Sequence, residues 1–266
     1  MISLPLFKRN MKAGLKLSLI FIAVLAMYTS VIIYMFDPEM AKLLEEYQKM
    51  IPGMMEAFGM TGNTGTLTAF IHTYLYGFFM LIIPMIFEIM LVNQLVMRYI
   101  DSGSMAVILA TPNSRKKVIV TQMISVLICI TFLVAVTVVI GIGCSELMFP
   151  RDLDISTYLM LNVSMLLIHF VISGIGFCAA CFFNETKGYL AVGAGVPIGF
   201  YLIQMLSNMG EKLDWMKYLT LYSLFSGDEI ISGSGGVLGS NLILIGLGIC
   251  FYSIGVSKFI KKDLYL

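Results

Sequence analysis

Charged side chains are scarce in this chain of 266 residues, where Asp, Glu, Lys and Arg together make up only 12%. Apolar residues make up 59%, and the mean hydropathy is +0.91. Because a soluble domain contains about 45–50% apolar residues, glycine included, this excess predicts burial in lipid. The formal net charge is only +1, so we expect no nucleic-acid partner.

The residues that usually build catalytic or metal sites are also few and scattered. The two histidines, His72 and His169, lie in different apolar runs, and no third ligand accompanies them. Cys178 and Cys181 form a C-x-x-C pair inside an apolar run, where they are interpreted as small buried hydrophobes. No segment matches the phosphate-binding motif G-x-x-x-x-G-K-[ST]. We therefore expect no catalytic residue, no bound metal and no cofactor held by this chain.

Six apolar runs are each long enough to cross a membrane as a helix, which takes about 20 residues. Turn-forming residues separate the runs, as at Asp37 and Pro38. The chain is thus predicted to be a single all-α integral membrane domain over residues 1–266. The predicted spans are 17–36, 67–97, 118–143, 157–183, 189–207 and 238–257, with outer loops at 37–66, 144–156 and 208–237.

Two of these segments are unusual. The second span, 67–97, would be about 46 Å long as a helix, against a hydrocarbon core of about 30 Å. We expect it to kink at Pro84 and to continue beyond the membrane. The loop 208–237 combines Trp215 and Tyr218 with scattered charges, which is typical of an interfacial or re-entrant segment.

The distribution of cations predicts the orientation. With six spans both termini lie on one side, and twelve of the 17 lysines and arginines fall on that side. Because cytoplasmic loops are enriched in Lys and Arg, we expect cytoplasmic termini. The twelve cations are Lys8, Arg9, Lys12, Lys16, Arg98, Arg115, Lys116, Lys117, Lys187, Lys258, Lys261 and Lys262.

The segment 98–117 (RYIDSGSMAVILATPNSRKK) holds four of these cations and one acid. Ser102 is a suitable N-cap for a short helix from Gly103 to Ala110. Pro112 would end that helix, because the residue before a proline avoids the α conformation. The pattern predicts a short helix between the second and third spans.

One side of this short helix is apolar. Met105, Ile108 and Leu109 have the i, i+3, i+4 spacing of a single helix face, so the helix would lie against the inner face of the membrane. Asn113 or Ser114 can cap the span that follows. An ordinary cytoplasmic loop with membrane-facing cations is the alternative that the residues themselves leave open.

The residue order resembles the first cytoplasmic loop of ABC exporter permeases of the type-2 class. Their usual pattern is an acid, then Gly-Thr-Leu or similar, an apolar segment and Pro-x-Ser-Arg. In that family the loop forms the coupling helix that docks into the ATPase subunit. The resemblance assigns this role to Asp101, Ser102, Gly103, Ser104, Met105, Ile108, Leu109, Pro112, Ser114 and Arg115.

Other parts of the chain are similar to the same family. The amphipathic segment 6–16 resembles its interfacial elbow helix, and residues 259–264 resemble a frequent C-terminal ending. Many members carry a second acid two residues before the first, where this chain has Tyr99. This departure puts in doubt any contact that the extra acid would make with the ATPase.

The resemblance implies a non-catalytic permease subunit of an ATP-driven exporter in a bacterial plasma membrane. Separate ATPase subunits would bind ATP and Mg, and a second permease copy or a related permease would complete the dimer within the lipid. An amphipathic or antimicrobial peptide or toxin is the expected substrate, with drugs or lipids as the alternative. A self-contained, ion-coupled secondary transporter is the alternative of a different class.

Glu88 is the only acid within a predicted span, and its burial at the membrane centre costs about 2.5–3.5 kcal/mol. Such a residue indicates a translocation path or a dimer seam, or else an ion pair with a neighbouring helix near the inner headgroups. Met85, Phe79 and Asn93 complete the predicted path. The bulky apolar residues among them also fit an ordinary lipid-facing helix.

Overall fold

The computed structural model describes residues 2–37, 43, 46, 50, 52–60 and 64–262. Within these residues the chain is helical and contains no strand. Six segments are long and apolar enough to cross a membrane, which confirms the predicted number of spans. They are Leu4–Tyr34, Phe79–Asp101, Arg115–Met148, Ile155–Phe182, Thr186–Asn208 and Val237–Lys261.

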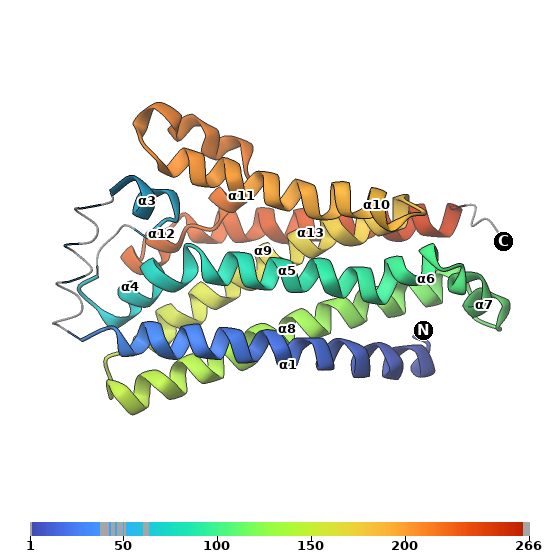
Figure 1. Ribbon diagram of the computed structural model, residues 1–266, viewed down its shortest axis with the longest axis horizontal. Coiled ribbons are helices and arrows are strands. Elements are labelled where there is room, and N and C mark those ends of the chain that lie inside the picture. The colour runs from blue at the N-terminus through green and yellow to red at the C-terminus, as the bar shows by residue number, and fades with distance from the viewer. Residues whose placement is uncertain are drawn as a thin grey trace.

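The spans run side by side in an elongated bundle (Figure 1). The start of the first span and the end of the last lie at the same end of the bundle, as an even number of spans requires. We call this end the terminal face; it holds Leu4, Asp101, Arg115, Thr186 and Lys261. The opposite end is the distal face.

Shorter elements divide or connect the spans. The first half of the chain contains α1 (Leu4–Tyr34), α3 (Pro52–Ala57), α4 (Leu67–Ile71), η1 (His72–Tyr76), α5 (Phe79–Val92), η2 (Asn93–Met97), α6 (Arg98–Asp101), α7 (Ser104–Ala110) and α8 (Arg115–Met148). The second half contains α9 (Ile155–Phe182), α10 (Thr186–Tyr189), η3 (Leu190–Ala194), α11 (Gly195–Asn208), η4 (Glu211–Leu219), η5 (Tyr222–Leu224), α12 (Gly227–Ser232) and α13 (Val237–Lys261).

The first span starts earlier than predicted, because α1 is continuous from Leu4 to Tyr34. The expected elbow at 6–16 is therefore not a separate helix. Asn10 donates a side-chain hydrogen bond to Ser125 of α8 at 3.3 Å. Gly14 lies so close to the Cys129 thiol that a Cβ atom would overlap it. These contacts hold the N-terminal turns of α1 along α8.

The second predicted span is interrupted near its start. A turn at Gly77 separates η1 from α5. A Cβ atom at Gly77 would lie 2.7 Å from the backbone oxygen of Phe58 and 2.9 Å from that of Gly59, so this turn requires glycine. Pro84 lies within α5 without ending it, which membrane helices tolerate. The helical segment continues past residue 97 and ends at Asp101.

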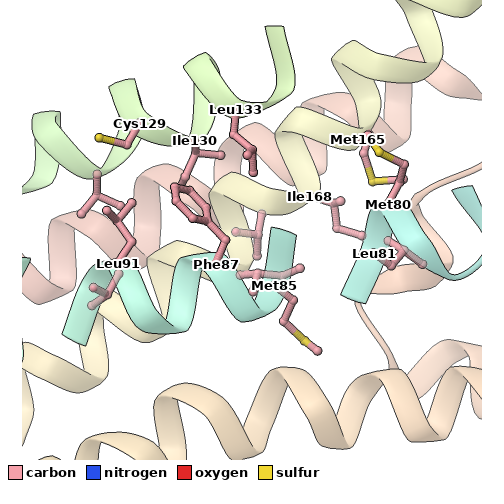
Figure 2. Close-up of a cluster of buried hydrophobic side chains, with 14 of the residues drawn as sticks. Met80, Leu81, Met85, Phe87, Leu91, Cys129, Ile130, Leu133, Met165 and Ile168 are labelled. Atoms are coloured by element: carbon pink, nitrogen blue, oxygen red, sulfur yellow. The ribbon is translucent and has the colours of Figure 1, made fainter. Parts of the chain in front are cut away.

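The core is centred on α9, whose most apolar stretch is 72% buried, against 22% for both the Thr186–Asn208 and the Val237–Lys261 spans. Figure 2 shows side chains of α5 meeting those of α8 and α9. Phe87, Ile130, Leu133 and Ile168 are all fully buried in this cluster. α13 packs along α9, and α1 packs along α8. The outer faces of α1, α11 and α13 are left apolar and exposed.

The distal loops differ from their predicted extents. About half of 37–66 lies outside the described residues. α8 continues to Met148, and Asp154 caps α9 by accepting from the backbone N–H groups of Ser156 and Thr157, so that only residues 149–154 of 144–156 are loop. Within 208–237, the 3₁₀ helix η4 folds back beside α11 (Figure 1), with Trp215 and Tyr218 exposed.

Candidate functional site at the terminal face

The segment between the second and third spans forms a helix that projects beyond the bundle at the terminal face (Figure 1). Gly103 has φ +70° and turns the chain away from α6, a conformation that favours glycine. α7 then ends at Ala110, and Thr111, which precedes Pro112, is extended as expected. Ser114 accepts a hydrogen bond from the Lys117 N–H at 3.2 Å and caps α8, as predicted.

Ser102 is not the N-cap that the sequence predicted. That position is taken by Gly103, one residue later, and α7 begins at Ser104. The Ser102 hydroxyl donates to the Arg98 carbonyl oxygen at 2.7 Å and lies 2.9 Å from the Ser104 hydroxyl oxygen. Ser102 therefore closes the end of α6, and its hydroxyl also accepts from the N–H of Ser104, the first residue of α7, at 3.4 Å.

α7 is apolar on one side only, as the spacing predicted. Met105 is buried, and Ile108 and Leu109 are half-buried against the core. Val107 faces solvent with 71% of its surface exposed, and Ser104 is also exposed. The bundle thus holds α7 by one row of side chains and presents the opposite row outward.

Hydrogen bonds connect both ends of this segment to the other elements at the terminal face. Asp101 Oδ2 accepts from the Thr186 hydroxyl of α10 at 2.8 Å. Arg115 Nη1 donates to the Lys262 carbonyl oxygen at 2.5 Å, and Lys262 Nζ donates to the Phe183 carbonyl oxygen at 2.6 Å. Burial lowers the pKa of the Lys262 amine to about 8. Asp101 and Arg115, the charged residues on either side of α7, are therefore each hydrogen-bonded to another element.

The N-terminal turns of α1 also contact this region, which the sequence did not indicate. The guanidinium carbon of Arg9 lies 5.3 Å from the centre of the Tyr99 ring in α6, within the range of a cation–π contact. In the resemblance drawn from the sequence, Tyr99 stands where many type-2 permeases carry a second acid. In this chain it serves an internal contact between α1 and α6.

Two π-helical turns lie directly behind the terminal face. η2 connects α5 to α6, and η3 connects α10 to α11. The Tyr189 hydroxyl, at the end of α10, donates to the Ile89 carbonyl oxygen of α5 at 2.7 Å and joins the two spans. π turns interrupt the regular helical pattern and are frequent at functional sites. α6 and α10 are thus each attached to their span by an irregular turn.

The four residues predicted to form a translocation path face different neighbours. Phe79 lines an apolar pocket of about 290 Å³ beside α1. The Met85 sulfur accepts from the Tyr222 hydroxyl at 3.3 Å. Glu88 points toward α9, and Asn93 is half-buried in η2. Phe79, Met85 and Glu88 thus each contact a different part of the chain: the pocket beside α1, Tyr222, and His169 of α9.

Glu88 and His169 form a buried pair between α5 and α9. Glu88 Oε1 lies 2.9 Å from His169 Nδ1, and the two side chains are 1% and 0% exposed. The other ring nitrogen, Nε2, is 2.8 Å from the Met80 carbonyl oxygen and therefore carries a hydrogen. One further proton shared between Nδ1 and Oε1 would leave the pair neutral overall on whichever partner it sits, and a neutral pair costs less free energy to bury than a lone charge.

Other titratable groups do not gather into a site in the described part of the chain. His72 lies 3.7 Å from Asp228 near the distal face, far in the fold from His169. No group of three or more His, Cys, Asp or Glu side chains is placed to hold a metal among these residues. The five cysteines are free thiols.

A comparison with models of protein families places the chain in a family. Residues 55–265 match the family described as "Protein of unknown function (DUF2705)". The matched region begins in the distal segment before α4 and includes the terminal-face segment and the last five spans. No curated protein matches the chain.

Proposed function

The chain belongs to the DUF2705 family, and we propose that it is the membrane-spanning permease subunit of an ATP-driven ABC exporter. The observation that carries the proposal is α7, a short helix with one exposed side that lies between the second and third spans. Asp101 and Arg115, which flank it, form hydrogen bonds with Thr186 and Lys262 next to other spans. A cytoplasmic ATPase needs such a projecting element in order to act on a membrane protein. In this proposal the chain contributes no catalytic residue.

The contacts around α7 suggest how a displacement of that helix would spread. Asp101 and Thr186 connect α6 to α10, so the two short helices would move together. Each is attached to its span through a π turn, η2 or η3, where the helix is irregular. Arg115 and Lys262 link the start of α8 to the end of α13. ATP-driven closure of the ATPase subunits would then change the relative positions of four spans.

The proposal fixes an orientation and a set of partners. The terminal face would be cytoplasmic, because twelve of the 17 cations belong to it or to segments next to it. Two ATPase subunits would hold ATP and Mg. A second copy of the chain, or a related permease, would cover part of the apolar surface of α1, α11 or α13, with lipid around the rest. The expected location is the plasma membrane of a bacterium.

An amphipathic or antimicrobial peptide or toxin is the substrate that we propose. Such a peptide carries an apolar face that matches the apolar outer surfaces of α1, α11 and α13, and a polar face that a lipid bilayer rejects. Drug or lipid export is the alternative within the same class, since both kinds of substrate are also largely apolar.

A second candidate function, ion-coupled secondary transport, is favoured by the Glu88–His169 pair. A buried pair that shares one proton is a feature of proton relays within membranes. Glu88→Gln removes the exchangeable proton while keeping a hydrogen-bond donor for His169 Nδ1. Transport by matched amounts of wild type and variant is the test. Unchanged transport would exclude both proton coupling and a role for Glu88 in the path.

The test of the export proposal is ATP hydrolysis in lipid nanodiscs. The full chain is measured alone and with the ATPase encoded beside it, as wild type and with Asp101→Ala and Arg115→Ala combined. We expect activity only with the ATPase present, and its loss or uncoupling from transport in the double variant. Lys187→Ala, an exposed cation on the same face, is the control that should behave as wild type.

Thr186→Val refines this experiment because it leaves Asp101 in place and removes only its hydroxyl partner. We expect it to bind the ATPase normally and to hydrolyse ATP with reduced transport per ATP. If no ATPase associates with the chain, or if the double variant behaves as wild type, the export proposal fails and ion-coupled transport becomes the better explanation.

A further inference from the structure

A groove of about 720 Å³ runs along the membrane-facing surface between α8 and α13, with side chains of α9 as its floor. It begins near the terminal face, where Lys116 contributes to its wall. Along α8 it extends to Leu127 and along α13 to Leu244. The translocation residues and α7 contribute nothing to it, so the groove is a feature separate from the site described above.

The lining of the groove changes in polarity along its length. Lys116 is its only charged lining residue, and Ser257 and Ser253 line the same half, one helical turn apart on α13. The other half is lined by apolar groups such as Leu127 and Leu244. The groove therefore combines a cationic, hydroxyl-bearing end at the terminal face with an apolar end in the membrane interior.

We propose that this groove binds one anionic phospholipid from the leaflet at the terminal face. The lipid phosphate would pair with Lys116 and the ester region would meet Ser257, while one acyl chain would fill the apolar part. A lipid in that leaflet has the same order of groups along the membrane normal. This inference requires only that the chain lies in a membrane, and it is independent of the proposed export function.

The dimensions favour a lipid over a transmembrane helix of a second copy. The groove extends about 16 Å along α8 and about 24 Å along α13, at 1.5 Å per residue. A helix of a second copy that crosses the hydrocarbon core of about 30 Å would extend past the groove, whereas a single acyl chain lies within one leaflet. A cation at one end of the groove also matches an anionic headgroup, whereas it gives no advantage to an apolar helix.

Glycines on α13 provide a matched pair of variants that separates the groove from the rest of the helix. A Cβ atom added at Gly248 would meet only Phe170, at 4.0 Å, so a leucine there would extend into the groove without a severe clash. A Cβ atom at Gly246 would meet nothing within 4 Å, and Gly246 is not part of the lining. Gly248→Leu should therefore fill the groove, and Gly246→Leu should leave it open.

The experiment is native mass spectrometry of the full chain purified in detergent, titrated with phosphatidylglycerol or with phosphatidylcholine of the same acyl chains. We expect one phosphatidylglycerol to be retained per chain in preference to phosphatidylcholine. Lys116→Gln should weaken phosphatidylglycerol binding about fivefold and leave phosphatidylcholine unaffected, because one cation near an anionic lipid has about that effect. Lys261→Gln, an exposed cation outside the groove, is the control.

Gly248→Leu should weaken binding of both lipids by more than about tenfold, because each acyl methylene that is displaced from the groove weakens binding about fourfold. Gly246→Leu should bind as wild type. Two results would overturn the proposal. One is that Gly248→Leu retains phosphatidylglycerol as wild type does. The other is that Gly248→Leu changes only the oligomeric state measured by light scattering, from dimer to monomer. That result would identify a second copy of the chain as the occupant of the groove.

Discussion

α9 and α7 are held in the protein by different means. α9 is enclosed by α5, α8 and α13, and it contributes the fully buried His169 to a pair with Glu88. α7 is seven residues long, and Met105 is its one buried side chain. Its position depends on Met105, on the half-buried Ile108 and Leu109, and on hydrogen bonds at Asp101 and Arg115, outside the helix itself.

This difference indicates that α9 contributes to the stability of the fold, whereas α7 is available for contact with a partner. A change in or against α9 removes contacts on several sides at once, so its effect should appear in the free energy of unfolding. A change on the exposed side of α7 removes almost no contact within the chain. It should appear only when the chain meets another protein, which is the property expected of a docking helix.

The largest loss of stability should follow His169→Ala. The carboxyl group of Glu88 would then be buried with no partner, at a cost of about 3 kcal/mol. Glu88→Gln should cost less than about 1 kcal/mol, because its amide can donate to neutral His169. Denaturant unfolding of both variants in the same detergent measures the difference. Equal losses would show that the pair contributes nothing specific to the packing of α5 on α9.

A smaller loss is expected where α8 approaches α9 through a glycine. A Cβ atom at Gly141 would overlap the hydroxyl of Tyr158, whose side chain is 1% exposed. Gly141→Val should therefore cost about 1–3 kcal/mol, as overpacking of a closed core does. Gly143→Val, two residues away with nothing within 4 Å of its Cβ position, is the matched control. Similar unfolding midpoints for the two variants would contradict the close packing of α8 on α9.

Much of the fold follows from local sequence signals. Six apolar runs predicted six spans, and the boundary residues Pro112 and Ser114 act as their local chemistry predicts. A kink was expected in the second span at Pro84, which lies inside the continuous helix α5. The sequence did not indicate the interruption at Gly77, where the backbone of Phe58 and Gly59 packs closely. Such a contact depends on a distant segment and has no signature in the residues around Gly77.

An ion pair between Glu88 and a neighbouring helix was one of the alternatives expected from the sequence, but His169 was not identified as the partner. Glu88 and His169 each lie 13 residues before the end of their span, Asp101 and Phe182, and both spans run toward the terminal face. They are therefore at the same depth, about 20 Å from that end. An equal distance from the terminal face does not by itself predict that α5 and α9 are neighbours. The contacts of Thr186 and Lys262 depend in the same way on which spans pack together.

A pH dependence is expected from Lys262, which closes the network beside α7. Its amine has a pKa lowered from 10.5 to about 8 by burial. Between these values the unfolded chain binds more protons, so stability should increase as the pH rises from about 8 toward 10.5. Lys262→Met removes the buried amine and should remove that increase. Thermal unfolding midpoints of wild type and variant at pH 7.5 and 9.5 test this, and parallel shifts in the two proteins would contradict it.

The smallest change in stability should come from the exposed side of α7. Val107 is 71% exposed, so Val107→Asp should change the free energy of unfolding by no more than about 0.5 kcal/mol. If the ATPase docks on this side, a charge placed in the apolar contact should weaken ATPase binding about tenfold or more. Binding of the purified ATPase to nanodiscs that hold the variant measures this effect, with Lys187→Ala as the control. Unaltered binding would mean that the ATPase does not dock on the exposed side of α7.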